Sequence, residues 1–234
     1  IQGFVAAVPE ANKDAYKKHA EEAFQIFKEF GVTRMVESWE EDVPDGEVTD
    51  HRRAVKAEPG EKIVFSWFEY PSKDVADAAE QKMMSDPRFE QMGKMPFDGK
   101  RMIYGGFETI ADTGSASGTD YINGTVIPVT TTNKQAYTAS ATAMGKLFVE
   151  HGATRVVDGW GVNVPEGKVT DFQRSVQATA DETVGFGWVE WPSKEASDAG
   201  WKTIMADPRM QANEMPFDAK RMIFGGFTPL LDMR

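Results

Sequence analysis

The sequence contains no cysteine, which excludes disulfides, thiol nucleophiles, zinc ribbons and iron–sulfur clusters. It also has no uninterrupted apolar run of about 18 residues, so no segment predicts a membrane-spanning helix. Basic residues are in deficit, with 26 lysines and arginines against 37 aspartates and glutamates and a formal net charge of −11. Nucleic acid and anionic membranes need a basic footprint. We therefore predict that neither is a partner.

The motifs of common enzyme classes are missing as well. No HExxH, GxSxG, P-loop or GxGxxG string occurs in the chain. No leader with charged, apolar and small-residue regions opens the sequence, so in the absence of cysteine we expect a cytoplasmic protein. Neither a metal ion nor an organic cofactor is predicted, because no ligand set or cofactor-binding motif is present.

What the sequence does contain is an internal repeat. Residues 3–112 align with residues 124–232 at an offset of about 121 residues. The anchors are Val-Thr-Asp at 48–50 and 169–171, Asp-Pro-Arg at 86–88 and 207–209, and Gly-Gly-Phe at 105–107 and 225–227. We predict two copies of one domain, residues 1–112 and 121–234, joined by a small, polar and flexible linker at 113–120.

Each copy predicts the element order β-α-β-β-β-α-β. In the first copy, Asn12 can cap a helix whose apolar stripe runs from Tyr16 to Phe27, and Gly31 fits the position just past its end. Pro128 stands where the first copy has Ala7, and predicts a bulge or an early strand end. The remaining expected elements are strands at 3–8, 33–39, 50–57, 63–70 and 101–110 and a second helix at 72–85.

This order describes an α+β fold: a ferredoxin-like unit with one strand added to its central hairpin. An open sheet of this kind has two helices on one face and leaves an apolar face and strand edges without partners. Packing two such sheets face to face covers the apolar face and forms an α+β barrel. We predict that the two copies pack in this way, as an intrachain pseudo-dimer.

Five strings in the chain, at residues 3–9, 43–50, 65–73, 83–88 and 95–108, carry a family likeness. They resemble the bacterial YbaA-like family, a domain of unknown function in the dimeric α+β barrel superfamily. The resemblance covers nearly all of the first copy and, more loosely, the second. It implies the fold, and in that family a homodimer of single domains, but no established activity. The superfamily includes cofactor-free monooxygenases, haem proteins and isomerases.

Polar and aromatic residues on the predicted strands form the candidate binding site. Strand alternation places Phe65, Trp67 and Glu69 on one face, and the repeat supplies Phe186, Trp188 and Glu190. If this face points inward, each glutamate needs a partner, for which the adjacent predicted strand offers Arg53 and Arg174. The set could be a structural ion pair or a ligand-facing pocket, since both roles would retain the residues.

Other candidates have a structural and a functional interpretation. Trp39 and Trp160 could wall a cavity or seal the core, and the core is favoured. The acidic run at 40–47 suggests calcium, but the second copy has lost most of that charge, which favours a solvated loop. The histidines, His19, His51 and His151, have no histidine counterpart in the other copy, and a solvated role is favoured over catalysis.

Three hypotheses for function remain open. The leading one is a protein that binds a small molecule in a pocket between the copies. The second is a cofactor-free oxygenase or isomerase with Glu69 or Glu190 as general base. The third is an acidic module that binds a basic protein. In addition, residues 138–143 carry small side chains where the first copy is charged, which predicts that this helix packs against the other copy or a second chain as a homo-oligomer.

Overall fold

The computed structural model describes residues 1–212 and 215–234. The first copy contains four strands and its helices in the order of a ferredoxin-like unit. These elements are β1 (Gln2–Pro9), η1 (Glu10–Asn12), α1 (Lys13–Glu29), β2 (Arg34–Asp42), α2 (His51–Ala54), β3 (Glu61–Glu69), α3 (Lys73–Met83), α4 (Arg88–Gln91) and β4 (Ile103–Gly114).

The second copy repeats that order. Its elements are β5 (Tyr121–Thr130), η2 (Thr131–Asn133), α5 (Lys134–Glu150), β6 (Arg155–Asn163), α6 (Phe172–Ser175), β7 (Glu182–Trp191), α7 (Lys194–Ala206), α8 (Pro208–Ala212), η3 (Ala219–Arg221) and β8 (Ile223–Met233). The last strand of the first copy, β4, extends to Gly114, so it includes the first two residues of the predicted linker.

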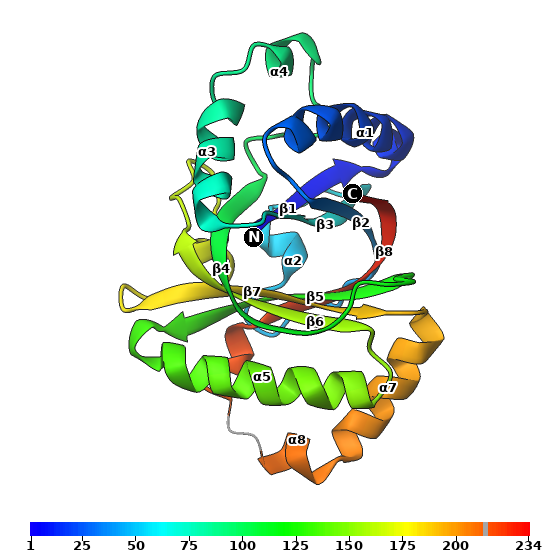
Figure 1. Ribbon diagram of the computed structural model, residues 1–234, viewed down its shortest axis with the longest axis vertical. Helices are drawn as coiled ribbons and strands as arrows, with labels where there is room; N and C mark the ends of the chain where they lie inside the picture. Colours follow the sequence, from blue (N-terminus) through cyan, green and yellow to red (C-terminus); the bar gives the residue numbers. More distant parts are fainter. Residues whose placement is uncertain (213–214) are drawn as a thin grey trace.

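The strands close into a single barrel in the order β1-β3-β2-β8-β5-β7-β6-β4. Two antiparallel pairs join the copies: β2 pairs with β8, and β4 pairs with β6. In Figure 1 the barrel lies between two layers of helices, with α1 and α3 over one side and α5 and α7 over the other. The predicted α+β pseudo-dimeric barrel is therefore confirmed, and it has no free sheet edges at the junction of the copies.

The extra strand predicted at 50–57 was wrong. Those residues form the short helix α2, and the side chain of Asp50 caps it by accepting a hydrogen bond from the Arg53 amide. The second copy forms α6 in the same way with Asp171 as its cap. The threonines before each cap bind across the pseudo-dimer, Thr49 Oγ1 to the Ser175 carbonyl and Thr170 Oγ1 to the Ala54 carbonyl. The apolar residues of segment 50–57 thus pack between the two copies and do not form a strand of the sheet.

Two local predictions also need correction. Asn12 occupies the N-cap position of α1, but its side-chain amide donates to the carbonyl of Pro96 at 2.7 Å and does not cap the helix. Pro128 causes neither a bulge nor an early end in β5, whose register with β7 is continuous. It lies beyond the part of β5 that pairs with β8, where a missing amide hydrogen is tolerated. Gly31, with φ of 101°, ends the α1 segment as predicted.

The helix α5 packs against the end of β4. A Cβ atom on Gly145 would lie 2.8 Å from Thr113 Oγ1, so the small residue allows a close approach between helix and strand. Ala141 and Gly145 are buried, whereas Ala139 and Ala143 are exposed. The contact predicted for this helix is therefore made with the strand that continues from the first copy, and a contact with a second chain stays a prediction.

Candidate functional site

The aromatic face predicted on β3 and β7 points into the barrel. The rings of Phe65 and Phe186 stack with centroids 4.6 Å apart, and those of Trp67 and Trp188 stack with centroids 4.2 Å apart. All four side chains are buried. Each stacked pair takes one ring from each copy. The two copies together therefore fill the interior of the barrel with aromatic side chains.

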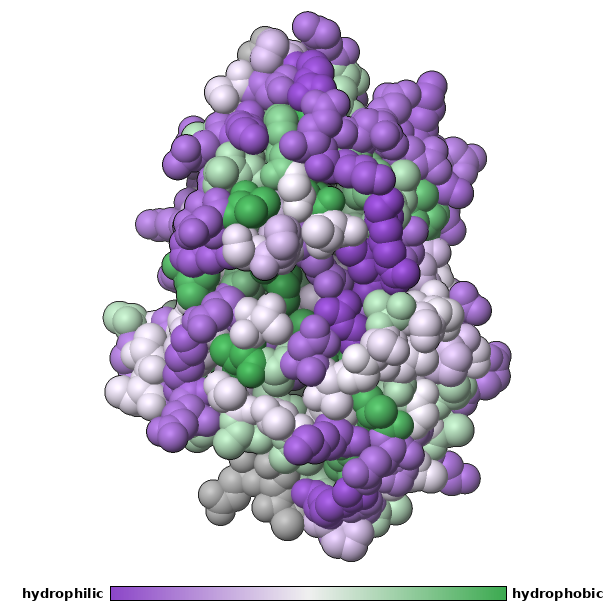
Figure 2. Space-filling view, viewed as in Figure 1, coloured by the Kyte–Doolittle hydropathy of each residue, from purple (hydrophilic) through white to green (hydrophobic). Residues whose placement is uncertain are grey.

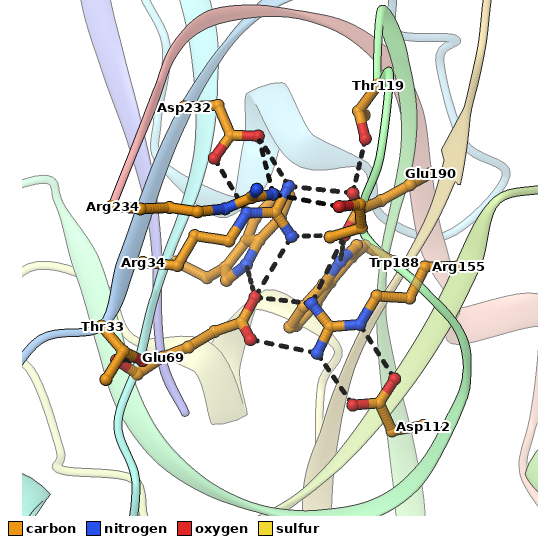
Figure 3. Close-up of polar contacts among 12 residues, drawn as sticks. Thr33, Arg34, Glu69, Asp112, Thr119, Arg155, Trp188, Glu190, Asp232 and Arg234 are labelled. Atoms are coloured by element: carbon orange, nitrogen blue, oxygen red, sulfur yellow. Dashed lines mark hydrogen bonds and ion pairs between the residues drawn. The ribbon is translucent and has the colours of Figure 1, made fainter.

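The two glutamates of this face end in a network of ion pairs at one mouth of the barrel (Figure 3). Arg34 donates to both carboxylate oxygens of Glu190, at 2.8 and 2.9 Å. Arg155 donates in the same way to Glu69, at 2.8 and 3.0 Å. Each copy therefore supplies an arginine to the glutamate of the other copy, as shared bidentate pairs.

Further groups complete the network. Asp232 accepts from Arg34, and Asp112 accepts from Arg155. The linker contributes Thr119, whose hydroxyl donates to Glu190 at 2.6 Å. Burial alone would raise the pKa of Glu190, but hydrogen bonds and charge from Arg34 hold that pKa below its usual value. The side chains at this mouth satisfy one another and do not depend on a ligand.

Arg53 and Arg174 do not pair with these glutamates. Arg53 lies in α2, where it contacts the Asp50 carboxylate at 3.2 Å and donates to the carbonyl of Gly46. Arg174 does the same with Asp171 and Gly167. The predicted Arg53–Glu69 pairing was therefore wrong, because the segment is a short helix and not a strand beside β3.

A second group of polar residues lies outside the barrel, between α1 and the sheet of the first copy. Tyr16 and Glu37 come from α1 and β2, and Ser66 comes from β3. The hydroxyl of Tyr16 donates to Glu37 Oε2 at 2.6 Å, and the hydroxyl of Ser66 donates to the same oxygen. All three side chains are buried. The sequence patterns did not predict this cluster, although a glutamate stands in the middle of an otherwise apolar strand.

A cavity of about 260 Å³ opens beside this cluster. Most of its lining is apolar, and Glu37, Tyr16, Ser66 and His19 supply the polar atoms. On the face shown in Figure 2, apolar residues gather between α1 and α3 among mostly hydrophilic side chains. The apolar lining residues are Phe4, Ala6, Ala20, Ala23, Phe27, Phe68, Met83, Phe89, Met95, Phe97 and Met102.

Burial raises the pKa of Glu37, and the hydrogen bonds from Ser66 and Tyr16 oppose part of that rise. Burial also raises the pKa of Tyr16 well above its usual value, so this phenol stays protonated and remains a donor. A carboxyl with a raised pKa in an apolar cavity is a common feature of binding and catalytic sites. This cavity is therefore the strongest candidate site in the described part of the chain.

The second copy has a related but altered cluster. Tyr137 donates to Asp158 at 3.0 Å, in place of the tyrosine–glutamate pair. Burial raises the pKa of Asp158 to about 6. Gly187 stands where the first copy has Ser66, while Ile127 and Met144 replace the cavity-lining Ala6 and Ala23. Ile127 packs in the same cluster as Tyr137, so a larger side chain lies beside the equivalent tyrosine.

A larger groove of about 520 Å³ runs between α3 and β4. Its lining includes exposed Tyr104 and Val162. The amide of Asn163 donates to Glu80 at 2.9 Å, so these polar groups of the groove are partners of each other. The groove offers no buried carboxyl comparable with Glu37 and is a weaker candidate for a specific site.

The remaining candidates from the sequence, Trp39, Trp160 and His51, are buried in the packed interior of the protein. Trp39 packs with Tyr16 under α1, and Trp160 packs with Tyr137 under α5. His51 was wrongly expected to be solvated: it is fully buried in the barrel, and burial lowers its pKa to about 4. Neither ring nitrogen has a described residue as a partner at hydrogen-bond geometry. Among the described residues, we find no cluster of three or more histidine, aspartate or glutamate side chains suited to a metal ion.

No helix within residues 1–212 and 215–234 is long and apolar enough to span a membrane.

The fold and the site define a class: a tandem α+β barrel in which one chain supplies both halves. The chain belongs to the family described as "Protein of unknown function (DUF1428)", whose sequence profile matches residues 1–99 and again residues 120–219. The predicted family resemblance is therefore confirmed.

The curated relatives are single-copy proteins. The chain is 66% identical over 113 residues to the uncharacterised protein YbaA of Escherichia coli (strain K12), covering 48% of this chain and 97% of that protein. Its counterpart in Shigella flexneri shows the same identity and coverage. These relatives carry no established activity.

Two solved structures share the fold across nearly the whole chain. A proposed monooxygenase from Lactobacillus acidophilus superimposes with a TM-score of 0.60 at 13% identity, covering 99% of this chain and 93% of that chain. An anthrone oxidase-like protein superimposes with a TM-score of 0.53 at 14% identity, covering 99% and 91%. At such low identity the likeness establishes the fold alone.

Proposed function

We propose that this protein binds a small, mainly apolar molecule in the cavity between α1 and the sheet of the first copy. The observation that carries the proposal is the buried carboxyl of Glu37, which faces an apolar cavity of about 260 Å³. Apolar walls with a few convergent polar groups are typical of small-molecule sites. The cytoplasmic location expected from the sequence is part of this proposal.

This proposal moves the binding site away from the barrel interior. Trp67, Trp188, Glu69 and Glu190 are engaged with one another and with Arg34 and Arg155. A ligand there would have to displace stacked rings and bidentate ion pairs, which is unfavourable. We assign these residues to holding the two copies together.

A second candidate function is proton transfer at the same cavity, as in a cofactor-free isomerase or oxygenase. Glu37 would be the general base in place of Glu69 or Glu190. Its raised pKa supports this role, since a base works best when its pKa lies near the ambient pH. The description of structural neighbours as oxygenases agrees with this candidate but does not carry it.

The test is to fill the cavity with the side chains that the second copy already uses. Ala6→Ile combined with Ala23→Met introduces the residues found at Ile127 and Met144. We expect fluorescence titration with 2-naphthol to show binding to the original protein and a loss of at least tenfold in the variant. Ala143→Met, on the exposed face of α5, is the matched control and should leave binding unchanged. Equal affinity in all three proteins would refute the proposal.

A further inference from the structure

The two oxygens of the Glu37 carboxyl have different surroundings. Oε2 accepts hydrogen bonds from the hydroxyls of Tyr16 and Ser66. Oε1 accepts none from the residues that the structure describes, yet it is not among the buried polar atoms left without a partner, so it retains accessible surface. Because Glu37 lines the cavity, Oε1 is the Glu37 oxygen available to a bound molecule, and the ring of His19 lies in the same lining.

This arrangement defines what the free oxygen can recognise. When Glu37 is ionised, Oε1 is an acceptor and needs a donor. When Glu37 is protonated, the hydrogen lies on Oε1, since Oε2 already accepts from two hydroxyls, and Oε1 becomes a donor. A hydroxyl group satisfies both states because it can donate and accept, whereas an ether or ketone oxygen can only accept.

The walls of the cavity indicate the rest of the molecule. The rings of Phe4, Phe27 and Phe68 form one aromatic wall. The ring centroid of Phe68 lies 4.8 Å from that of Phe4 and 4.7 Å from that of Phe27. Phe89 stacks on Phe27 at 5.4 Å. Aromatic faces of this kind favour a flat ring in offset-stacked or edge contact.

We infer that the ligand of this cavity is a planar aromatic molecule carrying a hydroxyl group, and that the hydroxyl binds Glu37 Oε1. This inference rests on the proposed function and names its ligand class. Glu37 is then a specificity-determining residue, because it distinguishes a hydroxyl from an oxygen without hydrogen.

The inference predicts a dependence on pH. The other titratable groups that line the cavity are Tyr16, which contacts Glu37, and His19, both from α1; β3 contributes Ser66, and the other described lining residues are apolar. Burial keeps Tyr16 protonated and lowers the pKa of His19, so His19 also changes charge in the acidic part of this range, and the Glu37→Gln variant isolates the part of the pH dependence that belongs to Glu37. Above the Glu37 transition only a donor binds well, and below it an acceptor is also accommodated.

The experiment compares 2-naphthol with 2-methoxynaphthalene by fluorescence titration from about pH 4 to about pH 9. Above the transition we expect 2-naphthol to bind at least about tenfold more tightly, and this ratio should fall as the pH decreases. Equal binding of the two probes above the transition would overturn the inference while leaving the proposed function intact. Failure of both probes to bind at every pH would overturn the proposed function and the inference together.

Glu37→Gln supplies the matched variant. An amide that accepts from Tyr16 and Ser66 through its oxygen places its NH₂ where Oε1 was, and this group only donates. We expect the variant to bind both probes with similar affinity at all pH values, as the protonated carboxyl does. The two probes differ by the same methyl group in both proteins. Its effect on binding therefore cancels when the affinity ratio of the variant is compared with that of the original protein. A variant that keeps the tenfold preference would refute the role of Oε1, and the pH series on the original protein tests the inference even if the variant fails to fold.

Discussion

Replacing Arg34 by methionine tests whether the ion pairs at the barrel mouth hold the copies together. The side chain of Arg34 is 5% exposed and that of Glu190 is 0% exposed. The substitution removes both hydrogen bonds to Glu190, which keeps Thr119 and Trp188 as donors. Leaving a buried charge fully unpaired costs about 3–5 kcal/mol, but Arg155 Nη1 stays 3.7 Å from Glu190 Oε1, so with the remaining donors we expect about 2–3 kcal/mol.

The chain supplies its own matched controls. Arg155→Met removes the pseudo-symmetric pair, but Glu69 is 20% exposed and can be hydrated, so we expect about 1–2 kcal/mol. Arg53→Met removes a pair in which the arginine is 53% exposed, so we expect less than about 1 kcal/mol. Equilibrium urea unfolding at neutral pH, with the slope compared between proteins, measures all three. If Arg34→Met costs no more than Arg53→Met, the network does not stabilise the barrel as argued.

The pH dependence gives a second readout. The pKa of Glu190 is depressed in the folded protein, so its contribution is present above the unfolded pKa and is lost as the pH falls through the folded one. In Arg34→Met the largest of the interactions that lower this pKa are removed, while Thr119 and Trp188 remain, so burial raises the pKa of Glu190 relative to the original protein. The variant therefore takes up a proton more readily, and the difference in stability between the two proteins should shrink in acid. A difference that stays constant from neutral pH to about pH 3 would contradict this account.

Three further results are expected. His51→Phe introduces the residue of the second copy and should stabilise the protein by roughly 2–4 kcal/mol at about pH 4. The pKa of His51 is about 4 in the folded protein and about 6.5 in the unfolded chain, so the original protein loses stability as the pH falls through that interval. Acid unfolding of both proteins measures the difference. Ser66→Ala removes a donor to Glu37, so its pKa rises and the preference for 2-naphthol should disappear at a higher pH. Calorimetry should give one 2-naphthol per chain, and Ile127→Ala with Met144→Ala should raise the number if those side chains fill the second site.

The barrel could be predicted because its causes are local and repeated. The duplication gave the number of copies, and strand alternation correctly placed Phe65, Trp67 and Glu69 on the inner face. The partner of Glu69 could not be predicted in the same way. Arg155 meets it only because β4 pairs with β6 across the copies, and that register depends on barrel closure rather than on any one strand.

The cavity was out of reach of sequence reasoning for a different reason. Its volume is the space left between α1 and the sheet, and that space depends on small residues such as Ala6 and Ala23 that periodicity treats as ordinary core. The error at 50–57 was of the opposite kind. A cap by Asp50 and packing between the copies determined α2, while alternation of apolar residues suggested a strand.

The two copies differ around the cavity, where the residues contact their own copy. They agree at the barrel mouth, where each copy supplies a partner to the other. At the barrel mouth, a change in Arg34 or Arg155 removes the bidentate partner of a glutamate in the opposite copy, so a change in one copy acts on the other. Around the cavity, Glu37 and Ser66 contact residues of their own copy, so the second copy can carry Asp158 and Gly187 without disturbing the first. A barrel built from two identical chains would carry every substitution twice. A tandem chain can keep a cavity in one half and fill it in the other, and this separation of a shared frame from an individual site is what makes the first copy the place to look for a ligand.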